Sequence, residues 1–172
     1  MRVLLIDDHA LFRIGLRELL ERRDIDVIDA VGDCEEGIRK ARELNPDVVL
    51  LDMRMPKMSG IDVLRALQKG DTGMPIVMLT TSTDERDLVE SLRNGAQGYL
   101  LKDMEPDELI DALQQIVQGN TVVAKELTAV LAKAVQGEVA PSAPSHRALA
   151  ELTPRARLID SAHVIRSKIV AV

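Results

Sequence analysis

Short apolar runs alternate with amphipathic segments over residues 1–120, and this alternation limits the possible folds more than any other feature of the sequence. A run that is apolar at nearly every position is typical of a strand in a parallel sheet covered on both faces. Between the runs, apolar residues recur at helical spacing. Repeated strand–helix alternation implies right-handed crossovers, so we predict an α/β fold with a doubly wound, five-stranded parallel sheet. The predicted strands are Val3–Ile6, Val27–Val31, Val48–Leu51, Ile76–Leu79 and Gly98–Leu101.

Polar side chains stand where four of these strands end. Asp7 and Asp8 follow the first strand, Asp52 the third, Thr80 the fourth and Lys102 the fifth. In doubly wound sheets, ligands bind outside the carboxyl ends of the strands, where the strand order reverses. We therefore predict that these five side chains lie on one rim of the sheet, although they are far apart in the sequence.

The three carboxylates of this rim are suited to a divalent cation. Mg²⁺ prefers oxygen ligands and keeps several waters, so Asp7, Asp8 and Asp52 would suit it. The backbone carbonyl of Arg54, in the loop after Asp52, is a candidate neutral ligand. The alternative interpretation of the acid pair alone is a solvated turn, because aspartate is common in turns.

Asp52 is the candidate nucleophile. A carboxylate beside a metal stays ionised and can attack a phosphoryl donor. The hydroxyl of Thr80 could hydrogen-bond a phosphoryl oxygen, and the Lys102 ammonium could pair first with Asp52 and then with the phosphoryl group. Taken alone, the hydroxyl residues around Thr80 would be a helix cap and Lys102 a surface lysine. Their shared rim favours the functional interpretation.

Tyr99, His9 and His163 are harder to interpret. Tyr99 is the single tyrosine of the chain, and it is either a partly buried amphipathic residue or a rotamer switch on the outer face. His9 and His163 have no metal-ligand spacing to other histidines or to cysteine, so a zinc site is not expected.

Composition narrows the class of protein. Cys34 is the single cysteine, which excludes an internal disulfide and predicts a reducing, cytoplasmic location. No apolar stretch approaches the roughly 18 residues of a membrane span, so no membrane partner is expected. The net charge is −6, and residues 1–136 carry −8 because five basic and three acidic residues follow Gly137. An acidic main domain repels a nucleic-acid backbone.

The chain after residue 120 divides into three predicted parts. Apolar residues at helical spacing predict a linker helix over 121–137, which forms a C-terminal helical extension of the sheet domain. Small residues with Pro and Ser predict a flexible linker over 138–151. A short mixed segment, 152–172, completes the sequence. The domain prediction is thus 1–120, 121–137, 138–151 and 152–172.

Taken together, these motifs resemble the receiver domain of two-component response regulators, in particular the NarL/FixJ (LuxR-type) subfamily. The resemblance covers about the first 120 residues and includes the strings Asp7-Asp-His-Ala-Leu-Phe-Arg13 and Gly95-Ala-Gln-Gly-Tyr-Leu-Leu-Lys-Asp103. The residues that carry it are Asp7, Asp8, Asp52-Met-Arg-Met-Pro56, Gly60, Thr80, Tyr99 and Lys102.

The resemblance implies a flavodoxin-like (CheY-like) fold with strand order 2-1-3-4-5. It implies that a sensor histidine kinase phosphorylates Asp52 in the presence of Mg²⁺. Thr80 and Lys102 would contact the phosphoryl group, and Thr80 and Tyr99 would relay its presence. The receiving surface would comprise the strand Gly98–Leu101 and the helices beginning near Asp84 and Pro106, through which a homodimer could form.

The subfamily normally ends in a DNA-binding domain of the helix-turn-helix type. Leu152-Thr-Pro-Arg155 resembles the opening of that domain, but Ala156 stands where Glu is usual and 157–172 does not resemble its recognition helix. We therefore expect 152–172 to be an incomplete remnant, and DNA to be a partner only if a complete output domain is supplied.

Three functions follow from these observations. The first is a response regulator whose phosphorylation controls transcription, with no enzymatic activity beyond self-catalysed phosphoryl transfer and autodephosphorylation. A second is a stand-alone receiver that acts by protein–protein interaction without binding DNA. A third is a phosphatase with an aspartyl-phosphate intermediate.

Overall fold

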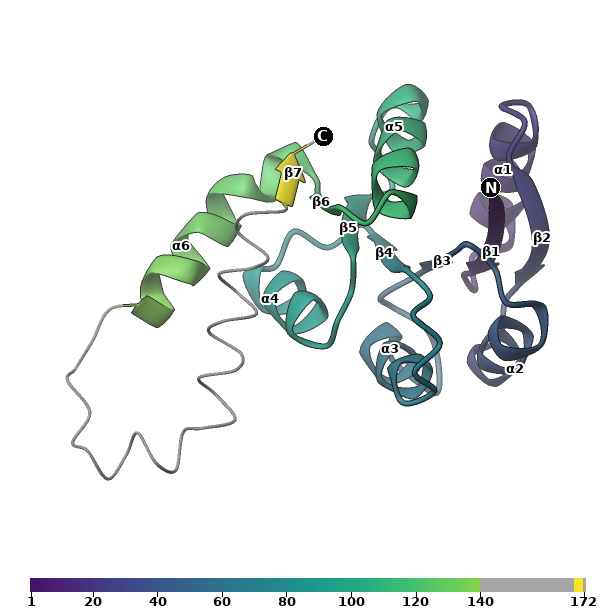
Figure 1. The fold of residues 1–172 in the computed structure, drawn as a ribbon, viewed down its shortest axis with the longest axis horizontal. Coiled ribbons are helices and arrows are strands. Elements are labelled where there is room, and N and C mark those ends of the chain that lie inside the picture. Colours follow the sequence, from purple (N-terminus) through teal and green to yellow (C-terminus); the bar gives the residue numbers. More distant parts are fainter. Residues whose placement is uncertain (140–168, 172) are drawn as a thin grey trace.

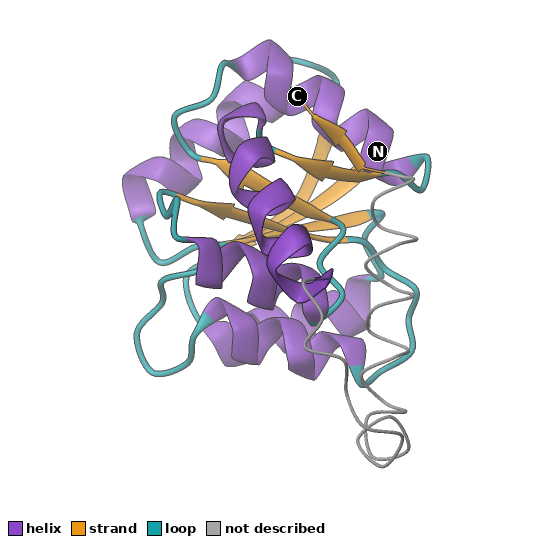
Figure 2. Cartoon of the chain, turned by 90° about the vertical axis from the view of Figure 1, so that its left-hand side faces the viewer, coloured by secondary structure: helices purple, strands orange, loops and turns teal. Residues whose placement is uncertain are grey.

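A computed structural model describes residues 1–139 and 169–171, and its centre is one parallel sheet with helices on both faces (Figures 1 and 2). The strands are β1 (Arg2–Ile6), β2 (Asp26–Val31), β3 (Val48–Leu51), β4 (Ile76–Thr80), β5 (Gly98–Leu101), β6 (Thr121–Val123) and β7 (Ile169–Ala171). The helices are α1 (Ala10–Glu21), α2 (Cys34–Leu44), α3 (Gly60–Gln68), α4 (Glu85–Arg93), α5 (Pro106–Val117) and α6 (Thr128–Val139), with a 3₁₀ helix, η1, at Lys125–Leu127.

The strand order is β2-β1-β3-β4-β5-β6-β7, and every neighbouring pair is parallel. The predicted flavodoxin-like order of the first five strands is therefore confirmed, and two short strands extend the sheet beyond β5. The order reverses at β1, because β2 lies on one side of it and β3 on the other. Ile6 pairs with Leu51 at this point, so the carboxyl ends of β1 and β3 are adjacent.

The core has two parts, one on each face of the sheet. Alternate residues of β1 point into different parts, with Leu4 and Ile6 on one face and Leu5 on the other. The first face packs against α2, α3 and α4, and the second packs against α1 and α5 (Figure 1). Leu64 and Leu113, one from each helical layer, are fully buried. Burial on both faces explains why these strands are almost continuously apolar.

The chain after α5 differs from the prediction of a helix over 121–137. Gly119 has φ 98° and turns the chain back toward the sheet. Val122 and Val123 then pair with Gly98 and Tyr99 of β5, because β-branched residues pack well on a pleated surface. The helix α6 begins only at Thr128 and continues two residues beyond the predicted boundary at 137.

The remaining C-terminal predictions fall largely outside the described residues. Of the predicted linker 138–151, the structure describes the first two residues, which belong to α6. Of the predicted helix-turn-helix remnant 152–172, it describes Ile169–Ala171, which forms β7 beside β6. None of the described helices has the length and apolar character needed to cross a bilayer.

Candidate functional site

The sheet's hydrogen-bond ladder continues one residue beyond the strands and thereby positions the rim residues. The Asp52 N–H donates to the carbonyl of Ile6 at 2.9 Å, and the Asp7 N–H donates to the carbonyl of Val31, the last residue of β2, at 3.0 Å. On the other side of the rim, the Lys102 N–H donates to the carbonyl of Thr80 at 2.9 Å. These backbone hydrogen bonds thus fix the Cα positions of Asp7, Asp52 and Lys102.

Asp7, Asp52 and Lys102 form a buried charged cluster. The residues Asp7 and Asp52 are 6% and 3% exposed, and the Lys102 side chain is 9% exposed. The Lys102 Nζ lies 2.7 Å from Asp7 Oδ2 and 3.3 Å from Asp52 Oδ2, so two carboxylates share one ammonium group. The same Nζ lies 4.5 Å from the centroid of the Phe12 ring, a cation–π contact that covers it.

Burial raises the pKa of Asp52 above its usual value, because the charged form loses hydration, and the negative charge of Asp7 raises it further. The Lys102 ammonium and the Arg54 backbone N–H, 3.4 Å from Asp52 Oδ1, oppose this rise. A second cation at the site would favour the ionised carboxylate, which is the nucleophilic form.

Two carboxylate oxygens point to where such a cation would bind. Asp8 Oδ1 and Asp52 Oδ2 are buried, and within the described residues neither accepts a well-formed hydrogen bond, although the Lys102 ammonium lies 3.3 Å from Asp52 Oδ2. Buried carboxylate oxygens that lack a full set of hydrogen-bond donors are costly, and a metal ion could bind both of these oxygens. Ligand atoms of Asp7, Asp8, His9 and Asp52 all lie within 4.8 Å of one another. The donor set therefore fits a divalent cation.

Thr80 anchors the loop that leads to α4. Its side chain is fully buried, and its Oγ1 accepts a hydrogen bond from the Ser82 N–H at 3.1 Å. Tyr99 contacts the same loop, because its hydroxyl donates to the Ser82 carbonyl at 3.1 Å. Tyr99 is fully buried rather than partly exposed, and burial raises the pKa of its phenol to about 12.

Asp87, which sequence reasoning missed, links this loop to the one after β3. The Arg54 guanidinium lies 2.9 Å from Asp87 Oδ2, and the Ser82 hydroxyl donates to the same oxygen. The link joins the residue two positions after Asp52 to the first turn of α4. The sequence pattern could not reveal this link, because an acidic residue in the first turn of a helix is already explained by its favourable interaction with the helix dipole.

His9 is the second residue that sequence reasoning missed. It is the N-cap residue of α1, and its backbone N–H donates to Asp7 Oδ1 at 2.8 Å. This turn brings the imidazole back over the acidic rim.

Comparisons with known proteins agree with this geometry. Residues 3–114 match the response regulator receiver domain family. The chain is 42% identical over 156 residues to the nitrate/nitrite response regulator protein NarL of Escherichia coli K12, an alignment that covers 90% of this chain and 71% of that protein. It is 39% identical over 132 residues to a homologue from Haemophilus influenzae, covering 76% of this chain and 64% of the relative.

Solved structures show the same fold. A LuxR-family response regulator from Aurantimonas sp. SI85-9A1 superposes with a TM-score of 0.73 at 31% identity, covering 77% of this chain and 95% of that one. The receiver domain of a NarL protein from Mycobacterium tuberculosis superposes with a TM-score of 0.66 at 30% identity, covering 69% and 96% of the two chains.

Proposed function

Because this chain belongs to the response regulator receiver domain family, we propose that Asp52 is its phosphoryl acceptor and that a sensor histidine kinase is the donor. One observation carries the proposal. Asp52 is buried where the strand order reverses, beside the acid pair, and its Oδ2 lies 3.3 Å from the Lys102 ammonium.

The reaction requires positioning and charge neutralisation more than covalent chemistry from the protein. A carboxylate oxygen of Asp52 attacks phosphorus as the bond from phosphorus to the donor breaks, which leaves an acyl phosphate on Asp52. Lys102 pairs with the new phosphoryl oxygens, and the Thr80 hydroxyl is the proposed hydrogen-bond donor to them. Mg²⁺, held by Asp7, Asp8, Asp52 and the Arg54 carbonyl, would neutralise charge on the phosphoryl group.

Phosphoryl transfer from acetyl phosphate is expected to require Mg²⁺. Chelation should abolish incorporation, and Asp8→Asn should raise the Mg²⁺ concentration needed for half-maximal labelling on the order of tenfold or more. Intact-mass spectrometry over a Mg²⁺ series measures both effects, with Asp26→Asn, an exposed acid on β2, as the matched control. Undiminished labelling in chelator would refute the metal requirement.

The loop contacts provide a route from the phosphoryl group to α4. A phosphoryl group can shift a conformational equilibrium only if it gains contacts in one state. Thr80 would gain such a contact, and its partner Ser82 is bonded to both Tyr99 and Asp87. Movement of Thr80 would therefore change the position of the first turn of α4.

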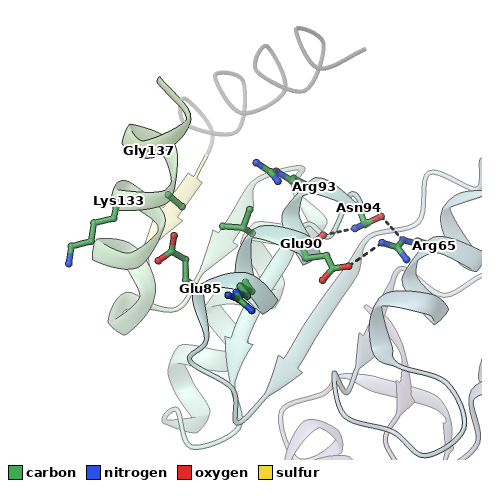
Figure 3. Close-up of a pocket in the computed structure, with 10 residues that line it drawn as sticks. Arg65, Glu85, Glu90, Arg93, Asn94, Lys133 and Gly137 are labelled. Carbon is green, nitrogen blue, oxygen red and sulfur yellow. Dashed lines mark hydrogen bonds and ion pairs between the residues drawn. The ribbon is translucent and has the colours of Figure 1, made fainter. Parts of the chain in front are cut away.

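The surface around α4 and β5 is in contact with β6 and α6, the C-terminal extension of the same chain. β6 pairs with β5, and Val130 and Leu131 of α6 pack against the core beside α4. A groove of about 700 Å³ runs between α4 and α6, where Arg65 bonds Glu90 and Asn94 (Figure 3). A homodimer through α4, β5 and α5 would have to displace or accommodate α6.

Beryllofluoride, which mimics a bound phosphoryl group, is expected to loosen α6 and to favour this dimer. With Mg²⁺ and beryllofluoride, amides of α6 should exchange hydrogen faster and the molar mass from light scattering should double. The same additions to Asp52→Asn serve as the control. Unchanged exchange and an unchanged mass in the wild-type chain would argue against α6 as part of the switch.

The two relatives are named as a nitrate/nitrite response regulator protein and a homologue of it, and we propose transcriptional control as the output of this lineage. The chain aligns with 71% and 64% of those two relatives, so DNA binding is proposed only for a chain with a complete output domain. A cytoplasmic location, where a kinase could reach Asp52, is part of the same proposal.

A further inference from the structure

The Arg13 side chain reaches back from α1 to the turn that carries the acid pair. Its Nη1 donates to the backbone carbonyl of Asp7 at 2.5 Å. This carbonyl lies just beyond the ladder between β1 and β2, which ends where the Asp7 N–H donates to the carbonyl of Val31. Among the described residues, no backbone N–H donates to the Asp7 carbonyl. Arg13 therefore supplies the donor that a longer neighbouring strand would supply.

Ion pairing does not account for the position of Arg13. The residue is half-buried, and in the part of the chain that the structure describes its guanidinium forms no ion pair with a carboxylate. Arg17, one turn further along α1, is by contrast paired with Glu21 at 2.8 Å. The charge of Arg13 is thus directed at a neutral carbonyl, although the acidic rim is close by.

Gly32, which follows β2, leaves the space that this guanidinium occupies. A Cβ at Gly32 would lie 2.9 Å from Arg13 Nη1 and 3.4 Å from Arg13 Cζ, and the three nearest atoms all belong to that guanidinium. Gly32 does not have a positive φ, so its backbone conformation does not require glycine. The close approach of Arg13 is therefore the physical reason for a residue without a side chain at this position.

We propose that Arg13 is a positioning residue for the cation site and that Gly32 makes room for it. The Arg13 hydrogen bond fixes the plane of the peptide between Asp7 and Asp8, and this plane sets the direction in which the Asp8 side chain leaves the backbone. Ligand oxygens of Asp7, Asp8 and Asp52 lie within 4.8 Å of one another in this arrangement. The inference rests on the proposed function, since it concerns the cation that phosphoryl transfer would use.

Removal of Arg13 has two effects on Mg²⁺ binding, and they have opposite signs. A nearby positive charge repels a cation, so an Arg13 that acted through its charge alone would weaken Mg²⁺ binding, and its loss would strengthen it. Loss of a positioning contact instead lets the acid pair rearrange, and outer-shell contacts of this kind are worth about tenfold or more in metal affinity. The sign of the measured change therefore separates the two roles.

Calorimetric titration of the full metal-free chain with Mg²⁺ measures this change. Arg13→Ala is expected to lower the Mg²⁺ affinity about tenfold, whereas the matched control Arg17→Ala should leave it unchanged. Gly32→Ala should lower the affinity in the same direction, because the new methyl group displaces the guanidinium. Gly15→Ala, where a Cβ would meet nothing within 4 Å, controls for the glycine substitution. Circular dichroism checks that each variant is folded.

The double variant and the labelling kinetics give two further readouts. In the Arg13→Ala background, Gly32→Ala should have no additional effect on Mg²⁺ affinity, because both substitutions remove the same contact. Saturating Mg²⁺ should restore the wild-type rate of labelling by acetyl phosphate in Arg13→Ala, since weaker metal binding leaves the reacting groups in place.

Unchanged or stronger Mg²⁺ binding by Arg13→Ala would overturn the proposal, as would an additional loss of affinity from Gly32→Ala in the double variant. A wild-type chain that binds Mg²⁺ but gains no phosphoryl group from acetyl phosphate would instead overturn the proposed function. The two failures are therefore distinguishable.

Discussion

Replacing Lys102 with methionine is expected to lower the free energy of unfolding at pH 7 by about 3–5 kcal/mol, because it removes the cation shared by two buried carboxylates. The methionine keeps most of the apolar stem of the side chain and removes the ammonium group that lies over the Phe12 ring. Urea unfolding followed by circular dichroism in metal-free buffer measures the change. The same variant should incorporate phosphoryl groups far more slowly, since Lys102 is the proposed partner of the phosphoryl group.

The loss of unfolding free energy in Lys102→Met should be smaller at lower pH. Lys102 lowers the pKa of Asp52, so its removal raises that pKa further. An acid whose folded-state pKa is raised favours folding at low pH and loses that contribution as pH rises through the folded pKa. The difference in unfolding free energy between the wild type and Lys102→Met should therefore decrease on mild acidification. Lys125→Met is the matched control, because Lys125 is exposed and its pair with Glu108 is worth about 0–1 kcal/mol. Equal effects of the two substitutions would contradict the account.

Replacing Gly60 with alanine is expected to disturb Asp52, the proposed acceptor, directly. A Cβ at this first residue of α3 would overlap the Asp52 carbonyl oxygen and lie 2.8 Å from Met53 Cα, both backbone atoms. Overpacking of this kind costs about 1–3 kcal/mol. Displacement of Asp52 by about 1 Å could slow phosphoryl transfer on the order of 100-fold. Labelling kinetics with acetyl phosphate and urea unfolding measure the two effects.

Gly15→Ala separates this local clash from a general effect of the substitution. Gly15 is a solvent-exposed residue in the middle of α1, and a Cβ there would meet no other atom within 4 Å. Alanine there should raise the free energy of unfolding by about 0.5–1 kcal/mol and leave the labelling rate unchanged. A labelling rate in Gly60→Ala equal to that in Gly15→Ala would show that α3 does not position the acceptor.

The sheet and its rim could be predicted because they follow from local pattern and one topological rule. Near-continuous apolar runs marked the first five strands, and parallel pairing necessarily brought their carboxyl ends together. Asp7, Asp52 and Lys102 accordingly meet in one buried cluster. The prediction did not depend on the contents of any loop.

The chain after α5 could not be predicted equally well. The apolar residues from Val123 to Leu131 fit a helical period, but Val123 belongs to β6 and Leu131 to α6. The pairing with β5 that decides this is a tertiary contact. β7 is a stronger example, because Ile169–Ala171 pairs with a strand more than 40 residues earlier in the sequence.

The contacts of His9 and Asp87 were missed for a related reason. Metal-ligand spacing between histidines and cysteine is a local sequence feature, whereas His9 meets three carboxylates across a turn. Asp87 is bonded across two loops to Arg54 and Ser82. Both depend on turn geometry, which hydrophobic periodicity does not encode.

Intact-mass spectrometry after incubation with acetyl phosphate and Mg²⁺ shows whether Asp52 is the phosphoryl acceptor. Asparagine at this position keeps the shape of the side chain and removes the nucleophile. The wild-type chain and the exposed-acid control Asp26→Asn should each gain the mass of one phosphoryl group, and Asp52→Asn should gain none. Equal incorporation in Asp52→Asn and the wild type would show that another residue accepts the phosphoryl group.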